Sequence, residues 1–209
     1  MIFINGFVIP QIKICGLTSV EEAGYLNENH VDFAGFVLYY PKSKRNISID
    51  NAKLIMDKLD SDIKKVAVVV SPKAEQIREI YEAGFDYIQI HGEYVKEFFD
   101  DIKLPVLKAF NISDMNVFES YSHDERIKGY VFDAAEPGSG KAFDWNILNK
   151  IERDGKLFFL AGGLNEENVK KAIDAVKPDA VDVSSGVEYG ERQGKDPEKI
   201  VKFIQMVRN

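Results

Sequence analysis

Short apolar runs alternate with segments of helical character along almost the whole chain, and this alternation restricts the fold more than any other feature. Eight runs have the composition of buried strands, and each is followed by a segment expected to be helical. Strict alternation predicts parallel strands joined by right-handed crossovers. Eight such units in 209 residues favour a single-domain α/β fold, the (β/α)8 TIM barrel. The alternative is an open doubly wound sheet, but the glycine-rich dinucleotide turn of that fold is missing after the first run.

The strands are expected at residues 11–15, 31–38, 66–70, 87–90, 106–109, 129–132, 157–160 and 180–183. The helices are expected at residues 19–29, 49–59, 73–83, 95–101, 115–121, 144–151, 165–176 and 197–207.

The first ten residues stand apart from this alternation. Two apolar triplets flank Asn5-Gly6, a pair that accepts the positive φ angles of a type I′ hairpin turn. Pro10 then separates the hairpin from the first barrel strand. We therefore divide the chain into a hairpin extension at residues 1–10 and a catalytic barrel at residues 11–209. Because an apolar hairpin is not stable alone in water, we expect it to cover the N-terminal mouth of the barrel or to join an interface.

Composition excludes several classes of function. The net charge of −7 argues against nucleic-acid binding, which favours a basic surface. No run of about 18 apolar residues is present to span a membrane. A single cysteine, Cys15, suits a protein of the reducing cytoplasm. A small anionic molecule can still bind at a local basic spot, and the sequence leaves monomer and homodimer open.

The chemistry of such barrels lies where the strands end, and Cys15 ends the first strand. Ser19 and Glu22 have the spacing of a capping box, so a helix should begin just after this cysteine. The positive end of that helix would favour the thiolate over the thiol. A lone cysteine is equally often an inert, buried side chain, so from these residues alone both readings stay open.

Three further strand-end or loop residues suggest a site. Asp133 should point toward the barrel axis, where partial burial would raise its pKa and allow it to donate a proton; the alternative is a loop-capping carboxylate. Arg45 ends a basic loop, where it is either solvated or positioned to grip a carboxylate with two hydrogen bonds. His91 is either a substrate contact or a packed histidine.

The last two units predict a phosphate site. Gly162 and Gly163 allow backbone N–H groups to approach a ligand closely. Ser184, Ser185 and Gly186 add hydroxyl groups and a second small turn, which opens a short extra helix. Loops after strands seven and eight are the usual phosphate site of this fold.

Several charged residues are expected inside the barrel. If the strands are placed correctly, the alternation of side chains along each strand points Lys13, Lys108 and Asp182 into the barrel. The first and eighth strands are neighbours in a closed barrel, so Lys13 and Asp182 should form a pair. Pairing avoids the cost of several kcal/mol that burying either charge alone would carry.

Ordered motifs then identify a resemblance. They are KICGLT at 13–18, YPKSKR at 40–45, QIHG at 89–92, Asp133 followed by GSGK at 138–141, AGGLN at 161–165 and VDVSSGVE at 181–188. From about residue 11 to the end, the chain resembles the phosphoribosylanthranilate isomerase family of tryptophan biosynthesis. The hairpin at residues 1–10 and Pro137 depart from that pattern.

The resemblance implies an Amadori rearrangement of N-(5′-phosphoribosyl)anthranilate to 1-(2-carboxyphenylamino)-1-deoxyribulose 5-phosphate. It implies that Asp133 is the general acid, Cys15 the general base and Arg45 the carboxylate anchor. From their places at strand ends, we also expect His91 and Asp182 to contact the substrate. An aldose–ketose shift needs one acid and one base rather than a metal or redox cofactor, and none is expected. The loop with Gly138, Ser139 and Gly140 is expected to act as a lid.

Three other functions are considered: two are enzymes with the same type of barrel, and one is a binding protein without catalysis. A histidine-pathway sugar isomerase would use two aspartates, and Cys15 stands where one of them would be. Indole-glycerol-phosphate synthase would need a catalytic lysine and glutamate at other strand ends. A non-catalytic barrel that binds a phosphorylated metabolite would have no use for Cys15, Asp133 and Arg45 together.

Overall fold

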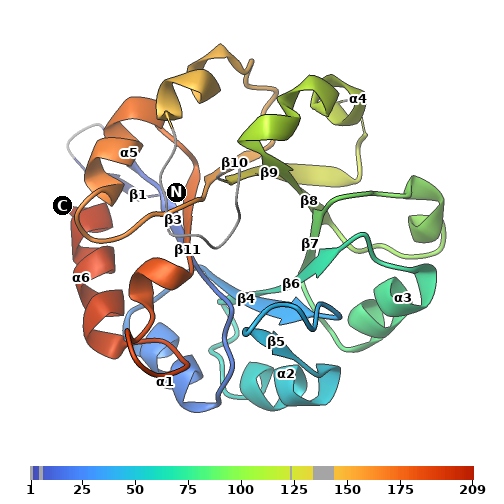
Figure 1. Cartoon of the computed structure of the whole chain (residues 1–209), viewed down its shortest axis with the longest axis horizontal. Coiled ribbons are helices and arrows are strands. Elements are labelled where there is room, and N and C mark those ends of the chain that lie inside the picture. The colour runs from blue at the N-terminus through green and yellow to red at the C-terminus, as the bar shows by residue number, and fades with distance from the viewer. Residues whose placement is uncertain (1, 5–6, 123, 134–143) are drawn as a thin grey trace.

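Eight parallel strands close into a barrel that is surrounded by helices, in a computed structural model that describes residues 2–4, 7–122, 124–133 and 144–209 (Figure 1). Each strand pairs with its neighbours in parallel, and the pairings β11–β3 and β3–β4 complete the circle. The predicted (β/α)8 barrel is therefore confirmed. The strands are β3 (Gln11–Cys15), β4 (Phe33–Leu38), β6 (Lys64–Val70), β7 (Tyr87–His91), β8 (Val106–Asn111), β9 (Ile127–Asp133), β10 (Leu157–Leu160) and β11 (Ala180–Val183).

The helical layer differs from the prediction after the fourth, fifth and sixth strands. There the predicted helices are the short 3₁₀ segments η1 (Lys96–Phe99), η2 (Ile112–Val117) and η3 (Trp145–Lys150), with a single turn α4 (Glu119–Ser122) after η2. In these segments the hydrogen bonds close turns of three residues rather than the wider turns of an α-helix. The other helices are α1 (Glu21–Glu28), α2 (Ile49–Met56), α3 (Ala74–Glu82), α5 (Val169–Val176) and α6 (Pro197–Arg208).

Two separate apolar layers follow from the alternation of side chains along each strand. One set packs between the strands and the helices, and it includes Ile12 and Ile14 of β3. The other fills the barrel itself, and it includes Cys15 together with Phe33 and Phe159, whose rings meet edge to face. Cys15 therefore lies on the inner face of β3, as the period-two pattern predicts.

Lys108 is the exception to the predicted parity. Its neighbours Leu107 and Ala109 belong to the layer inside the barrel, so Lys108 lies on the opposite face of β8. Its Nζ donates to the Ala109 carbonyl at 2.7 Å and lies 4.7 Å from the centre of the Phe110 ring. The prediction that Lys108 points into the barrel is wrong. A strand that is buried on both faces has apolar residues on each, so its sequence does not show which face is the inner one.

The N-terminal strands β1 (Ile2–Ile4) and β2 (Phe7–Ile9) pair antiparallel as a two-stranded sheet of their own. Asn5 and Gly6 lie outside the described residues, so the type I′ turn stays a prediction. The division of the chain at residue 10 and the covering of the barrel mouth also stay predictions. Among the helices described, none has both the length and the apolar character needed to cross a membrane.

Candidate active site

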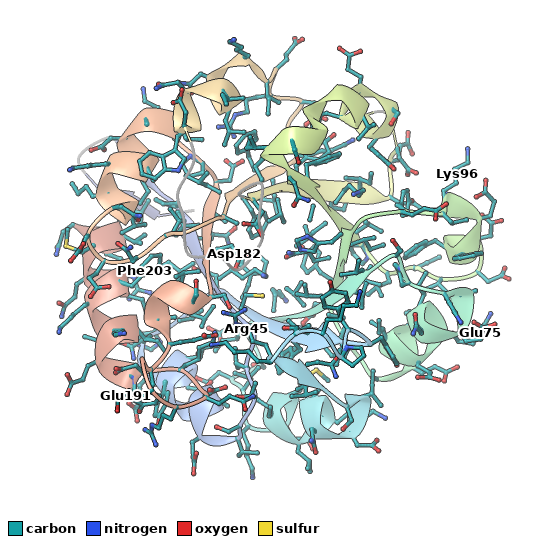
Figure 2. All side chains as sticks on the ribbon, viewed as in Figure 1. Arg45, Glu75, Lys96, Asp182, Glu191 and Phe203 are labelled. Carbon is teal, nitrogen blue, oxygen red and sulfur yellow. The ribbon has the colours of Figure 1, made fainter. Side chains whose placement is uncertain are left out.

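A cavity of about 610 Å³ opens at the carboxyl ends of the strands, and it collects most of the predicted site. Figure 2 shows Arg45 and Asp182 pointing toward the middle of the barrel, while Glu191 lies at the rim. Gly186 is not among the lining residues, and Gly138, Ser139 and Gly140 lie outside the described part of the chain. The predicted site residues that line the cavity are Cys15, Arg45, His91, Asp133, Gly162, Gly163, Asp182, Ser184 and Ser185.

The floor of the cavity holds a buried ion pair between neighbouring strands. Lys13 Nζ and Asp182 Oδ2 are 2.8 Å apart, and the Lys13 side chain is fully buried. The predicted pair is therefore confirmed. Burial alone would lower the pKa of Lys13, but the Asp182 carboxylate and Cys15 outweigh this effect and raise that pKa above its usual value. Lys13 is accordingly a cation at neutral pH.

Breaking this pair should destabilise the protein strongly. Asp182→Leu leaves the Lys13 ammonium buried without its counter-charge, and we expect the free energy of unfolding to fall by about 3–5 kcal/mol. The double variant Lys13→Met/Asp182→Leu replaces both charges with apolar groups and should recover most of that loss. Urea denaturation measures both variants. Equal destabilisation of the single and double variants would show that charge burial is not the cause.

The Cys15 thiol and the Lys13 ammonium meet over Gly35 of β4. A Cβ atom at position 35 would lie 2.9 Å from Cys15 Sγ and 3.1 Å from Lys13 Nζ. Glycine therefore makes the space in which these two groups come together. Burial raises the pKa of Cys15, whereas the adjacent Lys13 opposes that increase.

The start of α1 carries an acidic side chain of its own. The helix begins at Glu21, and the carboxylate of Glu22 accepts the backbone N–H groups of Thr18 and Ser19 at 2.6 and 3.2 Å. A negative side chain thus offsets the positive end of the helix. Lys13 and Lys195 are the cations that favour the Cys15 thiolate, and a contribution from the helix end stays a prediction.

The two predicted phosphate loops pack directly against each other. Gly162 and Gly163 have φ angles of 84° and 67°, which only glycine adopts readily. A Cβ atom at Gly186 would collide with the Leu164 carbonyl oxygen, so Gly186 serves this packing. Ser184 Oγ donates to the Cys15 carbonyl at 2.8 Å and joins the second loop to the end of β3. The predicted short extra helix is present as η4 (Ser185–Val187).

The helix after the first of these loops begins later than predicted. α5 starts at Val169, and residues 165–168 form a turn instead. Asn165 Oδ1 accepts the backbone N–H groups of Glu167 and Asn168 at 2.9 and 3.1 Å, while Asn168 Nδ2 donates to the Gly163 carbonyl at 2.8 Å. These bonds hold the glycine pair in place.

Arg45 has a partner that sequence reasoning missed. Its Nε and Nη2 donate to the two carboxylate oxygens of Glu188, the second at 3.1 Å. Lys195 Nζ lies 3.1 Å from Glu188 Oε1, and Lys44 Nζ lies 2.8 Å from Oε2. Burial alone would raise the pKa of Glu188, but these cations lower it to about 2. Glu188 was visible only as the last residue of VDVSSGVE, and no sequence signal marked Lys195.

His91 lines the cavity and also has a protein partner. Its Nε2 lies 3.0 Å from Gln89 Nε2. Burial, with Lys108 and Lys13 nearby, lowers the pKa of His91 to about 4, so the ring is neutral at pH 7. Gln89 Oε1 and Asp182 Oδ1 are buried acceptors without a partner among the described residues. These atoms suit the hydroxyl groups of a sugar, and the contact of His91 with substrate stays a prediction.

Among the described residues, no group of three His, Cys, Asp or Glu side chains is arranged to hold a metal ion. The cavity brings together the Asp133 carboxyl group, the Cys15 thiol beside buried Lys13, the Arg45 guanidinium and the two loops rich in glycine and serine. Such a set can move protons on a small anionic molecule.

Comparisons with known proteins agree with this chemistry. A family model described as N-(5'phosphoribosyl)anthranilate (PRA) isomerase matches residues 12–206. A relative from Clostridium acetobutylicum, named N-(5'-phosphoribosyl)anthranilate isomerase, is 38% identical over 208 residues, which cover 95% of this chain and 98% of the relative. The crystal structure of phosphoribosyl anthranilate isomerase from Thermotoga maritima matches with a TM-score of 0.83 and 36% identity, covering 95% of this chain and 98% of that chain.

A further solved structure is a phosphoribosyl anthranilate isomerase in complex with reduced 1-(o-carboxyphenylamino)-1-deoxyribulose 5-phosphate. It matches with a TM-score of 0.81 and 34% identity, again over 95% of this chain and 98% of that chain.

Proposed function

The chain belongs to the N-(5'-phosphoribosyl)anthranilate isomerase family of tryptophan biosynthesis, and from that membership we propose how its own residues perform the isomerisation. Cys15 is the general base and Asp133 the general acid. The observation that carries the proposal is that both side chains line one cavity from separate strands, β3 and β9. An acid and a base on different sides of a bound sugar are what an aldose–ketose shift needs.

The reaction proceeds through one proton transfer by Asp133 and one by Cys15, followed by tautomerisation of the enolamine. Asp133 donates a proton to the ribose ring oxygen as the C1′–O bond breaks, and the anthranilate nitrogen forms a protonated imine. The Cys15 thiolate then removes the proton from C2′, and the electron pair of that C–H bond neutralises the imine to give an enolamine. The enolamine tautomerises to the ketone by losing its hydroxyl proton and gaining one at C1′.

Anion-binding groups hold the substrate at its two ends. Arg45 binds the anthranilate carboxylate, for which a guanidinium offers paired hydrogen bonds. The backbone at Gly162, Gly163 and Ser184 and the hydroxyl of Ser185 bind the phosphate, at the usual position in this fold. Fixing both ends places the sugar between acid and base, and orientation of this kind accounts for a large part of enzymatic rate enhancement.

Further contacts complete the proposal. His91 and Asp182 face the sugar hydroxyl groups, and Lys13 supports the thiolate form of Cys15. The loop with Gly138, Ser139 and Gly140 closes over the substrate and excludes water. We place the enzyme in the cytoplasm on the strength of its single cysteine, and we infer a monomer or homodimer that binds no nucleic acid.

A direct assay tests the proposed function. The purified protein is expected to convert N-(5′-phosphoribosyl)anthranilate into the ring-opened ketose without any added metal or cofactor, and chelator treatment should leave the rate unchanged. Product identity is checked by comparing its chromatographic retention and mass with those of the chemically prepared ketose. Tight binding of the substrate without turnover would instead favour a non-catalytic barrel.

A further inference from the structure

Glu188 lies beside the cavity without lining it, and it holds Arg45 by one edge of the guanidinium group. A guanidinium has two edges on which a carboxylate can dock with two hydrogen bonds: Nε with Nη2, and Nη1 with Nη2. Glu188 occupies the first edge. No hydrogen bond from Nη1 to another described residue is present, and Arg45 is itself part of the cavity lining.

The stem of Arg45 is fixed as well. It lies across Gly16, where a Cβ atom would come within 2.5 Å of Arg45 Cδ. Gly16 directly follows Cys15, so the contact places the arginine next to the proposed base. With its stem on Gly16 and one edge on Glu188, the guanidinium has little freedom to turn.

Glu188 is in turn anchored by the buried Lys195 and by the half-buried Lys199. Lys195 is only 1% exposed, and its Nζ lies 3.1 Å from Glu188 Oε1 and 3.2 Å from the Ser184 Oγ and carbonyl oxygen. Lys199 Nζ donates to the Glu188 carbonyl at 2.8 Å. One lysine thus ties the carboxylate behind Arg45 to the serine of the phosphate loop.

From these contacts we propose that Glu188 is a positioning residue that presents the Nη1 edge of Arg45 to the substrate carboxylate. The inference rests on the proposed function, which makes Arg45 the carboxylate anchor. It adds that the selectivity for an ortho-carboxylated aryl amine depends on a side chain that does not itself touch the substrate. The opposite arrangement, in which Glu188 competes with the substrate for Arg45, predicts that removing Glu188 tightens binding.

The test compares two ligands that differ only in the carboxylate. They are reduced 1-(2-carboxyphenylamino)-1-deoxyribulose 5-phosphate and its phenylamino counterpart without that group. Isothermal titration gives the ratio of their Kd values for the wild type, Glu188→Gln, Glu188→Asp and the control Glu191→Gln. Glu191 is an exposed acid three residues along the same loop, so its replacement changes the net charge equally (Figure 2).

Both Glu188 variants are expected to lower the preference for the carboxylated ligand by about tenfold, because a paired, charge-assisted interaction loses its geometry. Their affinity for the ligand without carboxylate, and both affinities of Glu191→Gln, should stay at the wild-type values. Glu188→Asp keeps a negative charge opposite Lys195. It therefore still tests the inference if the glutamine variant does not fold. In kinetics, the aspartate variant should raise KM while leaving kcat within about twofold, as expected for uniform binding.

Two results would overturn the inference. An unchanged or increased preference in folded Glu188 variants would mean that Glu188 does not orient Arg45 for the carboxylate. If the wild type turns the substrate over but binds the two ligands equally well, Arg45 does not anchor the carboxylate. This inference would then be wrong, although the proposed isomerase activity would stand. A wild type that does not turn the substrate over would contradict the proposed function instead.

Discussion

Replacing Cys15 with serine is expected to lower kcat/KM for the isomerisation by about 10²–10⁴-fold, the usual cost of removing a general base. Serine preserves the size of the side chain, and position 15 is 8% exposed, so the barrel should fold normally. A hydroxyl group, however, has a much higher pKa than a thiol and scarcely ionises. A steady-state assay, with circular dichroism as the folding control, measures the effect.

The pH profile gives this prediction a second readout. Burial raises the pKa of the Cys15 thiol, so the thiolate is the minor form at neutral pH and its fraction grows as the pH rises. The groups that face the thiol are Lys13, Asp182 and Lys195, and Lys13 opposes the increase most. Wild-type kcat/KM should therefore climb with pH above neutrality, and Cys15→Ser should lack this rise. A serine variant with near-full activity would exclude Cys15 as the base.

Replacing Asp133 with asparagine is expected to lower kcat by a similar factor of about 10²–10⁴. Asparagine has nearly the same shape but carries no acidic proton for the ribose ring oxygen. The ring then has to open without a general acid, while the anchors at both ends of the substrate stay intact. The expected signature is a large decrease in kcat with little change in KM, measured by steady-state kinetics.

A ligand that is already ring-opened separates catalysis from binding at Asp133. Reduced 1-(2-carboxyphenylamino)-1-deoxyribulose 5-phosphate needs no proton on a ring oxygen, so its Kd for Asp133→Asn should match that of the wild type within about threefold, or 0.7 kcal/mol. A large loss of affinity for this ligand would indicate that Asp133 binds the substrate rather than protonating it. An asparagine variant with wild-type kcat would assign the acid to another residue.

Much of the fold and part of the site followed from local pattern. Alternating strand and helix segments predicted the barrel, and the limits of β3, β10 and β11 match the expected residues. Period-two parity predicted both the inward position of Cys15 and the pair between Lys13 and Asp182. These predictions succeeded because they depend only on chain neighbours and on the closure of an eight-stranded barrel.

Other features could not be predicted because nothing in the local sequence encodes them. Lys108 sits in a strand buried on both faces, so its orientation had no polar pattern to follow. The 3₁₀ segments after β7, β8 and β9 have helical composition, and composition does not distinguish a 3₁₀ turn from an α-helical one. The placement of Gly138, Ser139 and Gly140 lies outside the described residues, so the lid stays a proposal.

The sequence by itself determined the barrel, the strand ends that carry the chemistry, and the family to which the chain is similar. Only the tertiary structure decided what surrounds those residues. Arg45 and Glu188 are 143 positions apart in the chain, yet they meet at hydrogen-bonding distance, and buried Lys195 fixes the pair. The pKa of Cys15 likewise depends on burial and on Lys13, Asp182 and Lys195, which the fold brings around the thiol. Charge interactions act through space, and only the folded chain sets those distances.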